Sequence, residues 1–486
     1  MCLGEVKLRK AQSAAAAAAA VSGSVEGYTL EEVAKHATAS DCWLAVSGKV
    51  YDVSRWVHKH PGGSMIYVKA GGDATQLFNS YHPHYVRKML DKFYVGDVVP
   101  TPSSGAPPKG DPGAAPAALA IEYEEEECEF YRTLRTRVDG YFRSSRLNPR
   151  FSYAMYAKTA MILVGLVASY LCTFYLSSSL AVACLFGLVF GTLKAEVGVS
   201  IQHDANHGAY APLGWVGDVI GVTLDLVGAS SFMWKQQHVV GHHAYTNVVS
   251  ADPDVRVSDP DVRRCADSQP WRPYHRYQHI YLGFLYGLLS LKSTLLDDFK
   301  AWSEGAIGPV KLAQFTPTES MVFWGSKAFY FGYWFVLPLF FSPLGVGSLA
   351  AVWLSSEMVT GWLLAFMFQV AHVSDDVSFF ERAEDDGVVK KSWAVSQVES
   401  TADFCHGSSF WTHFSGGLNY QVVHHLFPGV CHCHYPQLAP IVMKTCKEFG
   451  VRYQVYETFW AALSGHIEHL RKVGAEVAIP SLANVG

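Results

Sequence analysis

Leu180–Val199 followed by His203-Asp204-Ala205-Asn206-His207 is the stretch that decides the fold of this chain. The apolar run is long enough to cross a bilayer as a helix. Soon after it come two histidines four residues apart, a spacing that puts both imidazoles on one helix face. An HX3H pattern alone is more often structural than functional, so its meaning depends on the rest of the chain.

Three further apolar runs reach spanning length: Met155–Leu176, Val322–Phe341 and Ser348–Val370. Short turns join the four runs in pairs, which predicts an α-helical membrane protein with about four transmembrane helices in two hairpins. Trp215–Phe232 and His279–Leu296 are less apolar, and we expect them to lie on the membrane rather than to cross it. Four crossings place both termini and the central polar stretch on one side, where they form a cytosolic cap.

Two more histidine clusters follow membrane segments on that same side. They are His238-Val239-Val240-Gly241-His242-His243 and Gln421-Val422-Val423-His424-His425. Histidines at these spacings can point two imidazoles at one metal ion. His372 lies at the cytosolic end of the last apolar run and is placed to join them.

The number of histidines indicates the kind of metal site. Imidazole suits zinc, copper, iron and nickel, so the ligand type alone does not choose. A structural zinc needs four ligands, whereas this larger set suits two metal ions with open positions. No glutamate lies in the clusters, unlike the carboxylate di-iron bundles. The sequence therefore predicts two non-haem irons held by His203, His207, His238, His242, His243, His372, His424 and His425.

Histidines in polar loops are often merely solvated, and each cluster has that structural alternative. We give this interpretation to His406, His413, His432 and His434. The whole chain has two non-enzymatic alternatives, a haem electron carrier and a metal transporter with histidine-rich loops. A transporter needs polar residues midway through its spans, whereas these histidines gather at one membrane face.

The N-terminal part carries a different cofactor motif. His60-Pro61-Gly62-Gly63 follows two predicted strands within Trp43–Val53, and Gly71-Gly72-Asp73-Ala74-Thr75 and Phe78 lie downstream. This combination resembles the core of cytochrome b5, a small α+β domain in which two histidines clamp a haem iron. The resemblance implies haem b, with His60 as one ligand.

The three histidine clusters resemble those of membrane-bound acyl desaturases and hydroxylases. Gln421, in place of the first histidine of the third cluster, resembles the front-end subclass, which inserts a double bond between an existing one and the carboxyl end. The strings Gln237–Asn247, Asp252–Arg256 and Gly416–Gln421 look most like Δ5 acyl desaturases of green microalgae and fungi. Δ4, Δ6 and sphingolipid Δ8 relatives share the clusters and stay as alternatives, as does an acyl hydroxylase.

The resemblance implies an enzyme that uses O2 and electrons passed from NADH-cytochrome b5 reductase through the haem to the irons. Its expected substrate is a long-chain polyunsaturated acyl group on a glycerolipid or a CoA ester, in the lipid membrane. The amide of Gln421 is a poor iron ligand, so we expect it to adjust substrate placement. The second haem ligand is His82 or His84, and we choose His82 for its spacing from Phe78 in domains fused to desaturases.

Charged residues near the membrane allow further expectations. Lys158 begins the first apolar run, where its amine can reach the interface. Lys194 and Glu196 interrupt the second, and we expect them to pair with each other or to lie near the interface. The Asp-Pro-Asp-Val-Arg strings at 252–256 and 259–263 are predicted to be turns. The alternative is an anionic head-group site formed by arginines, namely Arg256, Arg263 and Arg264.

The chain has 486 residues and a formal net charge of −5, which gives no reason to expect nucleic acid as a partner. We expect a disordered segment at 1–27, a cytochrome b5-like domain at 28–98, a Pro/Gly/Ala-rich linker at 99–120, a membrane desaturase domain at 121–475 and a tail at 476–486. The alanine run near the N-terminus also resembles a transit peptide. The endoplasmic reticulum is favoured as the membrane, with a plastid membrane as the alternative.

Overall fold

The computed structural model describes residues 27–82, 86–99, 123–125, 128–255, 261–381 and 388–475. The chain divides into two compact units between Ala120 and Ile121. The predicted disordered segment, linker and tail lie outside the described residues, except for two positions. Gly27 belongs to a strand, and the amide of Val99 donates to the carbonyl of Tyr28.

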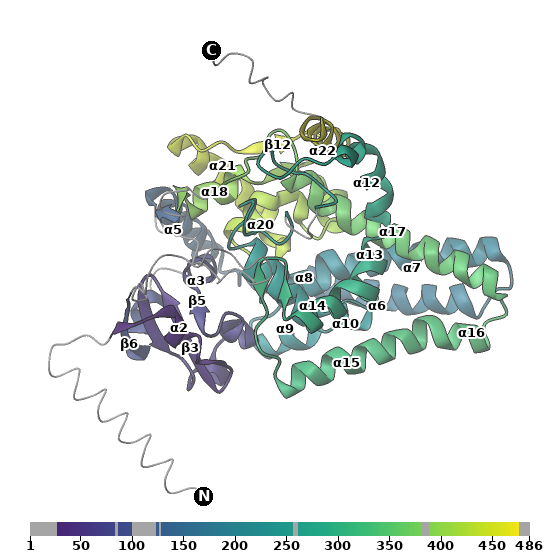
Figure 1. Ribbon diagram of the computed structural model, residues 1–486, viewed down its shortest axis with the longest axis horizontal. Coiled ribbons are helices and arrows are strands. Elements are labelled where there is room, and N and C mark those ends of the chain that lie inside the picture. Colours follow the sequence, from purple (N-terminus) through teal and green to yellow (C-terminus); the bar gives the residue numbers. More distant parts are fainter. Residues whose placement is uncertain are drawn as a thin grey trace, which may run out of the picture. The chain divides into compact units, whose positions relative to one another are not determined.

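The first unit is an α+β domain built on one sheet with the order β1-β6-β4-β3-β2, and with β5 beside β3 (Figure 1). Its described elements are β1 (Gly27–Tyr28), α2 (Leu30–Val33), β2 (Ala37–Thr38), β3 (Asp41–Val46), β4 (Lys49–Asp52), β5 (Gly72–Asp73), α3 (Thr75–Tyr81), α4 (Arg87–Leu90) and β6 (Tyr94–Val98). The antiparallel pair β3–β4 is the predicted hairpin, and it turns at Ser47 and Gly48, both with positive φ. Thr29 and Glu32 form a capping box on α2.

Three helices in the described part of the second unit are long and apolar enough to cross a membrane. They are α6 (Tyr153–Phe174), a continuous helix from Leu180 to Asn206, and α17 (Val346–His372). The continuous helix consists of α7 (Leu180–Glu196), a π-helical turn (Val197–Ile201) and α8 (Gln202–Asn206). A bent pair, Gly214–Leu226 and Ser231–His242, turns by 111° and makes a fourth span if it is taken as one.

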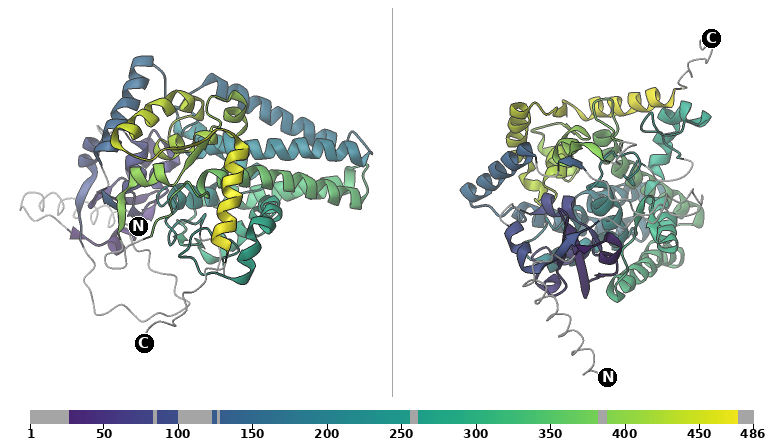
Figure 2. Two further views of the ribbon diagram at one scale, coloured as in Figure 1. Left: turned by 90° about the horizontal axis from the view of Figure 1, so that it is seen from above. Right: turned by 60° about the vertical axis from the view of Figure 1, so that its left-hand side comes forward.

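The predicted third crossing, Val322–Phe341, is helical but is not among these three. It comprises α15 (Pro317–Phe331), a π-helical stretch (Gly332–Val336) and α16 (Leu337–Phe341). Its exposed side chains include many large apolar residues, among them Met321, Trp324, Phe329, Leu339 and Phe340. Figures 1 and 2 show this segment running beside α6, α7 and α17, so the two predicted hairpins are present.

The two hairpins pack against each other through aromatic side chains and one close helix contact. Trp334 stacks on Phe190 with ring centroids 4.6 Å apart and meets Phe174 edge-on at 5.2 Å. On α7, Gly191 lies so near α17 that a methyl group there would overlap the carbonyl oxygen of Ser356. Small residues permit such close approach between helices in membranes.

Charged residues within the spans pair differently from the prediction. Lys194 donates to both carboxylate oxygens of Glu357, at 2.7 and 2.9 Å, and to the hydroxyl of Tyr330. Glu196 instead faces Lys158, with 3.6 Å between the charged atoms. The predicted Lys194–Glu196 pair is wrong because residues two apart on a helix do not face each other. Lys158 is buried, so the predicted reach to the interface is wrong as well.

The other elements of the second unit surround one end of these helices. They are β7 (Tyr123–Glu125), α5 (Glu129–Ser145), α9 (Gly214–Gly221), α10 (Thr223–Leu226), α11 (Ser231–Trp234), α12 (Gln278–Gly287), α13 (Leu289–Lys292), α14 (Asp298–Glu304), β8 (Ala306–Ile307), β9 (Val310–Lys311), β10 (Val389–Ser392), α18 (Trp393–Glu399), β11 (Ala402–Phe404), α19 (Ser409–Phe414), α20 (Gln421–Leu426), α21 (Tyr435–Phe449), β12 (Gln454–Tyr456) and α22 (Phe459–Gly474). The predicted surface run His279–Leu296 falls on α12, α13 and the π-helical turn after them.

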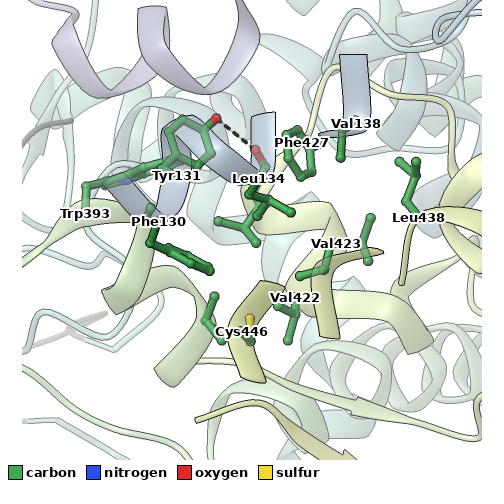
Figure 3. Close-up of a cluster of buried hydrophobic side chains, with 14 of the residues drawn as sticks. Phe130, Tyr131, Leu134, Val138, Trp393, Val422, Val423, Phe427, Leu438 and Cys446 are labelled. Atoms are coloured by element: carbon green, nitrogen blue, oxygen red, sulfur yellow. Dashed lines mark hydrogen bonds between the residues drawn. The ribbon is translucent and has the colours of Figure 1, made fainter. Parts of the chain in front are cut away.

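A buried apolar core supports the third histidine cluster (Figure 3). Helix α5 contributes Leu134 and Tyr131 to this core, and the hydroxyl of Tyr131 donates to the carbonyl of Leu426 at 3.2 Å. Val422 and Val423 of α20 are fully buried in the same core. The two valines therefore fix the orientation of the short helix that carries His424 and His425.

Candidate metal centre and haem site

Short helical segments with altered winding present two of the three histidine clusters. His203 lies on α8, directly after the π-helical turn Val197–Ile201, and His207 directly follows α8. His238 and His242 lie in the π-helical stretch Lys235–His242, and His243 directly follows it. The third lies on α20. π-Helical turns are rare and occur often at functional sites, because the extra residue changes which side chains share a face.

Four buried imidazoles form a first imidazole group, which consists of His203, His207, His238 and His424. One ring nitrogen of each lies within 4.8 Å of those of the others. In the part of the chain that the structure describes, Nε2 of His203 and Nε2 of His424 have no hydrogen-bond partner. Leaving a buried polar atom unpaired costs about 1–3 kcal/mol, and a metal ion bound at those nitrogens removes this cost. The donor set fits iron.

His242, His372 and His425 form a second imidazole group, also buried and also with ring nitrogens within 4.8 Å. Nε2 of His425 and Nε2 of His372 lie 3.2 Å apart. The side-chain amide of Gln421 lies 2.8 Å from Nε2 of His372 and 3.4 Å from Nε2 of His425. Rotating this amide by half a turn exchanges its nitrogen and oxygen, so Gln421 can offer a weak oxygen ligand to the same point.

His243 lies between the two groups. Its Nε2 is 3.1 Å from Nε2 of His238, and its ring stacks on that of His425 with centroids 4.4 Å apart. With His424 and His425 it forms a third set whose ring nitrogens lie within 4.8 Å. The structure therefore brings together all eight histidines predicted as ligands, His372 included. Their binding of iron stays a prediction.

The environment of four of these rings favours the neutral form. The four rings that lie outside the spans belong to His207, His243, His424 and His425. Burial, and after it the neighbouring imidazoles, holds the pKa of each of these rings well below its ordinary value. Neutral imidazole is the form that ligates metal ions. These four rings are therefore in the form that can bind a metal ion.

Polar residues outside the two groups orient individual ligands. The carboxylate oxygens of Asp252 lie 3.0 and 3.2 Å from Nδ1 of His242. Oε1 of Gln397 lies 2.9 Å from Nδ1 of His425. Such bonds fix the tautomer and leave Nε2 for a metal. Sequence reasoning does not find these two residues, because Asp252 belongs to a predicted turn and Gln397 lies in no motif.

The histidines predicted to be structural or solvated lie outside the two imidazole groups, and His432 and His434 are buried rather than solvated. Nε2 of His406 pairs with Asp403 at 2.7 Å, and Nδ1 of His432 pairs with Asp204 at 2.9 Å. His434 lies 3.1 Å from the carbonyl of Phe151. His413 has an exposed side chain, while its carbonyl accepts from buried Lys158. Asp204, His432 and Cys431 also lie within 4.8 Å of one another, but the first two already use their facing atoms on each other.

The arginines considered for a head group have internal partners. Arg264 is buried and donates to the backbone carbonyls of Asp267, Gln269 and Val473. Arg263 donates to the side chain of Gln369 at 2.5 Å and to a backbone carbonyl. Arg256 lies outside the described residues. Residues 252–255 form a turn closed by the Val255 amide at 3.1 Å from the Asp252 carbonyl, as the turn interpretation predicted.

In the first unit, His60 and His82 face each other with ring centroids 5.8 Å apart. Nδ1 of His82 lies 3.0 Å from the carbonyl oxygen of Phe78, which favours the tautomer that leaves Nε2 for iron. A side chain at position 62 would collide with the ring of His60, so Gly62 makes room for it. The pair fits a haem with two histidine ligands. His84, the alternative ligand, lies outside the described residues.

His82→Ala is expected to reduce the haem absorbance of the purified full chain to less than roughly a tenth of wild type, because one of the two predicted haem ligands is lost. The Soret band and the reduced α band, each scaled to protein, give the measurement. His84→Ala serves as the matched control and is expected to keep both bands. The opposite pattern would assign the second ligand to His84.

A helical membrane bundle with eight imidazoles gathered at one end, on the same chain as an α+β domain with two facing histidines, defines a membrane-bound oxidoreductase. Residues 177–457 match the family model for fatty acid desaturase, and residues 29–99 match that for the cytochrome b5-like heme/steroid binding domain. The chain belongs to the fatty acid desaturase family. As predicted, it is a front-end desaturase with a fused cytochrome b5-like domain.

Several known proteins are similar to this chain. An acyl-lipid (8-3)-desaturase of Physcomitrium patens is 54% identical over 448 residues, which is 92% of this chain and 91% of the relative. A protein of the same description from Mortierella alpina is 36% identical over 453 residues, covering 92% and 97%. Among solved structures, cytochrome b558 of Ectothiorhodospira vacuolata matches 15% of this chain and 99% of its own, with 32% identity and a TM-score of 0.15.

Proposed function

We propose that this protein inserts a cis double bond at the Δ5 position of a polyunsaturated acyl chain carried on a lipid. The convergence of eight buried imidazoles at one end of a membrane bundle carries the proposal of oxidative chemistry. A relative from Dictyostelium discoideum described as Delta(5) fatty acid desaturase A is 35% identical over 92% of this chain and supports the position. A Synechocystis sn-1 linoleoyl-lipid 6-desaturase, 35% identical over 71% of the chain, keeps Δ6 as the second candidate.

The two imidazole groups are the proposed sites of two irons. His203, His207, His238 and His424 would hold one, and His242, His372 and His425 the other, with His243 between them. The bound irons supply the O2 chemistry that breaks two unactivated C–H bonds, which no side chain can do. In the first unit, His60 and His82 would hold haem b, which would supply one-electron transfer from NADH-cytochrome b5 reductase.

The contribution of the chain itself is to position the substrate and to exclude water. All eight histidines are buried, so the cluster is screened from bulk solvent. Burying each CH2 group of an acyl chain contributes about 0.8 kcal/mol, so a long chain binds readily whatever its register. Displacing that chain by one methylene changes which carbon is oxidised, so the register depends on the head-group anchor and the end of the acyl channel. We place the cluster and the haem domain on the cytosolic side of the endoplasmic reticulum.

Gln421→His is expected to lower product formation by about 10- to 100-fold. An imidazole at this position would lie beside His372 and His425 and would add a strong ligand where the native amide is a weak one. Product yield and double-bond position, measured in microsomes and scaled to haem, test this expectation. Full activity with an unchanged double-bond position would remove the role proposed for Gln421.

Expression in yeast fed separately with C18 and C20 polyenes tests the proposed reaction. We expect a product two hydrogens lighter than its precursor, with the new double bond at carbon 5 by mass spectrometry. A bond at carbon 6 would favour the second candidate, and a gain of one oxygen would indicate a hydroxylase. Separation of lipid classes during the first minutes of feeding shows whether the product first appears on a glycerolipid or on CoA.

A further inference from the structure

We propose that the turn Thr246–Asp252, together with Gln397, is a positioning element for the second imidazole group. This inference rests on the proposed function, in which that group holds one of two irons. The turn comes soon after the second histidine cluster. Together with Gln397 it makes hydrogen bonds to His242, His372 and His425, the three histidines of the group. None of its residues belongs to the predicted ligand set.

Asp252 holds the first ligand. Its carboxylate lies 3.0 Å from Nδ1 of His242, and both side chains are buried. The same carboxylate accepts the backbone amides of Asn247 and Asp254, each at 2.8 Å. These two amides fix the carboxylate in place, so the ring of His242 is oriented by a rigid acceptor. A ligand histidine bonded in this way is oriented and made more basic.

Asn247 makes a hydrogen bond to the backbone of the second proposed ligand, His372. Its Nδ2 donates to the carbonyl oxygen of His372 at 2.9 Å, at the last residue of α17. The same amide lies 3.2 Å from the carbonyl of Ser378 and 3.3 Å from that of Ser400. Asn247 has a φ of 56°, in the left-handed region. The side chain of Asn247 therefore ties the turn to the end of α17 and to the chain that follows it.

Thr246 and Gln397 hold the third ligand. The hydroxyl of Thr246 lies 2.9 Å from Oε1 of Gln397 and 2.8 Å from the carbonyl oxygen of His242, so its one proton is shared between two acceptors. Oε1 of Gln397 accepts from Nδ1 of His425 at 2.9 Å. The acceptor of the His425 proton is thus fixed by a residue of the turn. Loss of the turn's contacts is expected to loosen His242, His372 and His425 together.

Asn247→Gly is the sharpest test, because glycine keeps the left-handed backbone and the amide bonded to Asp252 while it removes only the side chain. Asp252→Asn is the second variant, since it keeps the shape and removes the charge. Arg146→Gly is the matched control: Arg146 also has positive φ, at 55°, and its side chain is exposed. Total iron and haem are measured on the purified full chain. Non-haem iron is the difference between the two, and it is expressed per haem.

We expect about two non-haem irons per haem in the wild type and about one in both turn variants, because loss of an outer partner weakens metal binding by about 10- to 100-fold. Activity is expected to fall similarly and to recover when excess ferrous iron is added. The double variant Asn247→Gly/His425→Ala is expected to keep about one iron per haem, because both changes act on the same position.

Other results are equally informative. Two irons per haem in both turn variants, loss of both irons, or loss of all iron in the double variant would each overturn the inference. The same holds if Arg146→Gly loses as much iron as Asn247→Gly. A wild-type chain without two non-haem irons would refute the proposed metal centre itself, whatever the variants do.

Discussion

His425→Ala is expected to reduce double-bond formation by more than about 100-fold. Loss of a residue that only orients a ligand costs about 10- to 100-fold in metal affinity or activity, and His425 is itself a proposed ligand. Its ring lies 3.2 Å from Nε2 of His372 and stacks on His243, so its removal opens the second group and the space between the groups. Product per haem in membranes, with a fixed polyene substrate, gives the measurement.

His413→Ala is the control for this change, because His413 is exposed and lies in the same part of the chain. We expect it to keep wild-type product formation. The haem spectrum is expected to stay the same in both variants, since the haem ligands lie in the other unit. Undiminished product from His425→Ala, or from the matching His242→Ala, would refute the metal centre proposed here.

Glu357→Leu is expected to destabilise the membrane bundle by about 3 to 5 kcal/mol, the usual cost of removing one partner of a buried ion pair. Glu357 is fully buried and accepts from Lys194, Tyr330 and Ser290, on three other elements. Without it, the buried amine of Lys194 either carries an unpaired charge or gives up its proton, and both cost free energy. Thermal unfolding of the detergent-solubilised chain, followed by the fraction that stays monodisperse, gives the shift in Tm.

A double variant separates the pair from its individual residues. Lys194→Met/Glu357→Leu removes both charges and is expected to recover most of the lost stability. Lys292→Met breaks a half-exposed pair with Asp297, at 2.6 Å, and is expected to cost less than about 1 kcal/mol. A Glu357→Leu chain as stable as the Lys292→Met chain would show that the buried pair contributes nothing to the bundle.

The grouping of the eight histidines could be predicted because spacing along one helix determines which side chains share a face. His372 has no such neighbour, yet its place at the end of an apolar run was enough to include it. By contrast, Asn247 contacts His372, which is 125 residues away in the sequence, and Gln397 contacts His425, which is 28 residues away. Contacts of this kind leave no periodic pattern, so a single sequence does not reveal them.

The charged residues of the spans show the opposite case, in which a local reading gave the wrong partner. Lys194 and Glu196 are close in sequence, but Glu357, 163 residues away from Lys194, is the partner on the facing helix. The predicted third crossing, Val322–Phe341, is a milder example. It is helical and packs with the others, although residues such as Lys327 and Tyr330 make it less apolar than α6 or α17.

Because the side chain of Gly191 is a single hydrogen atom, α7 and α17 can approach each other closely at this position. His203 lies about 18 Å further along the same continuous helix, at 1.5 Å per residue, and His372 ends the opposing one. A tilt of the helix by roughly 10° about Gly191 would therefore move His203 by about 3 Å. Bulkier side chains at Gly191 offer a way to change the distance between the two imidazole groups from within the bundle, without altering any of the eight histidines.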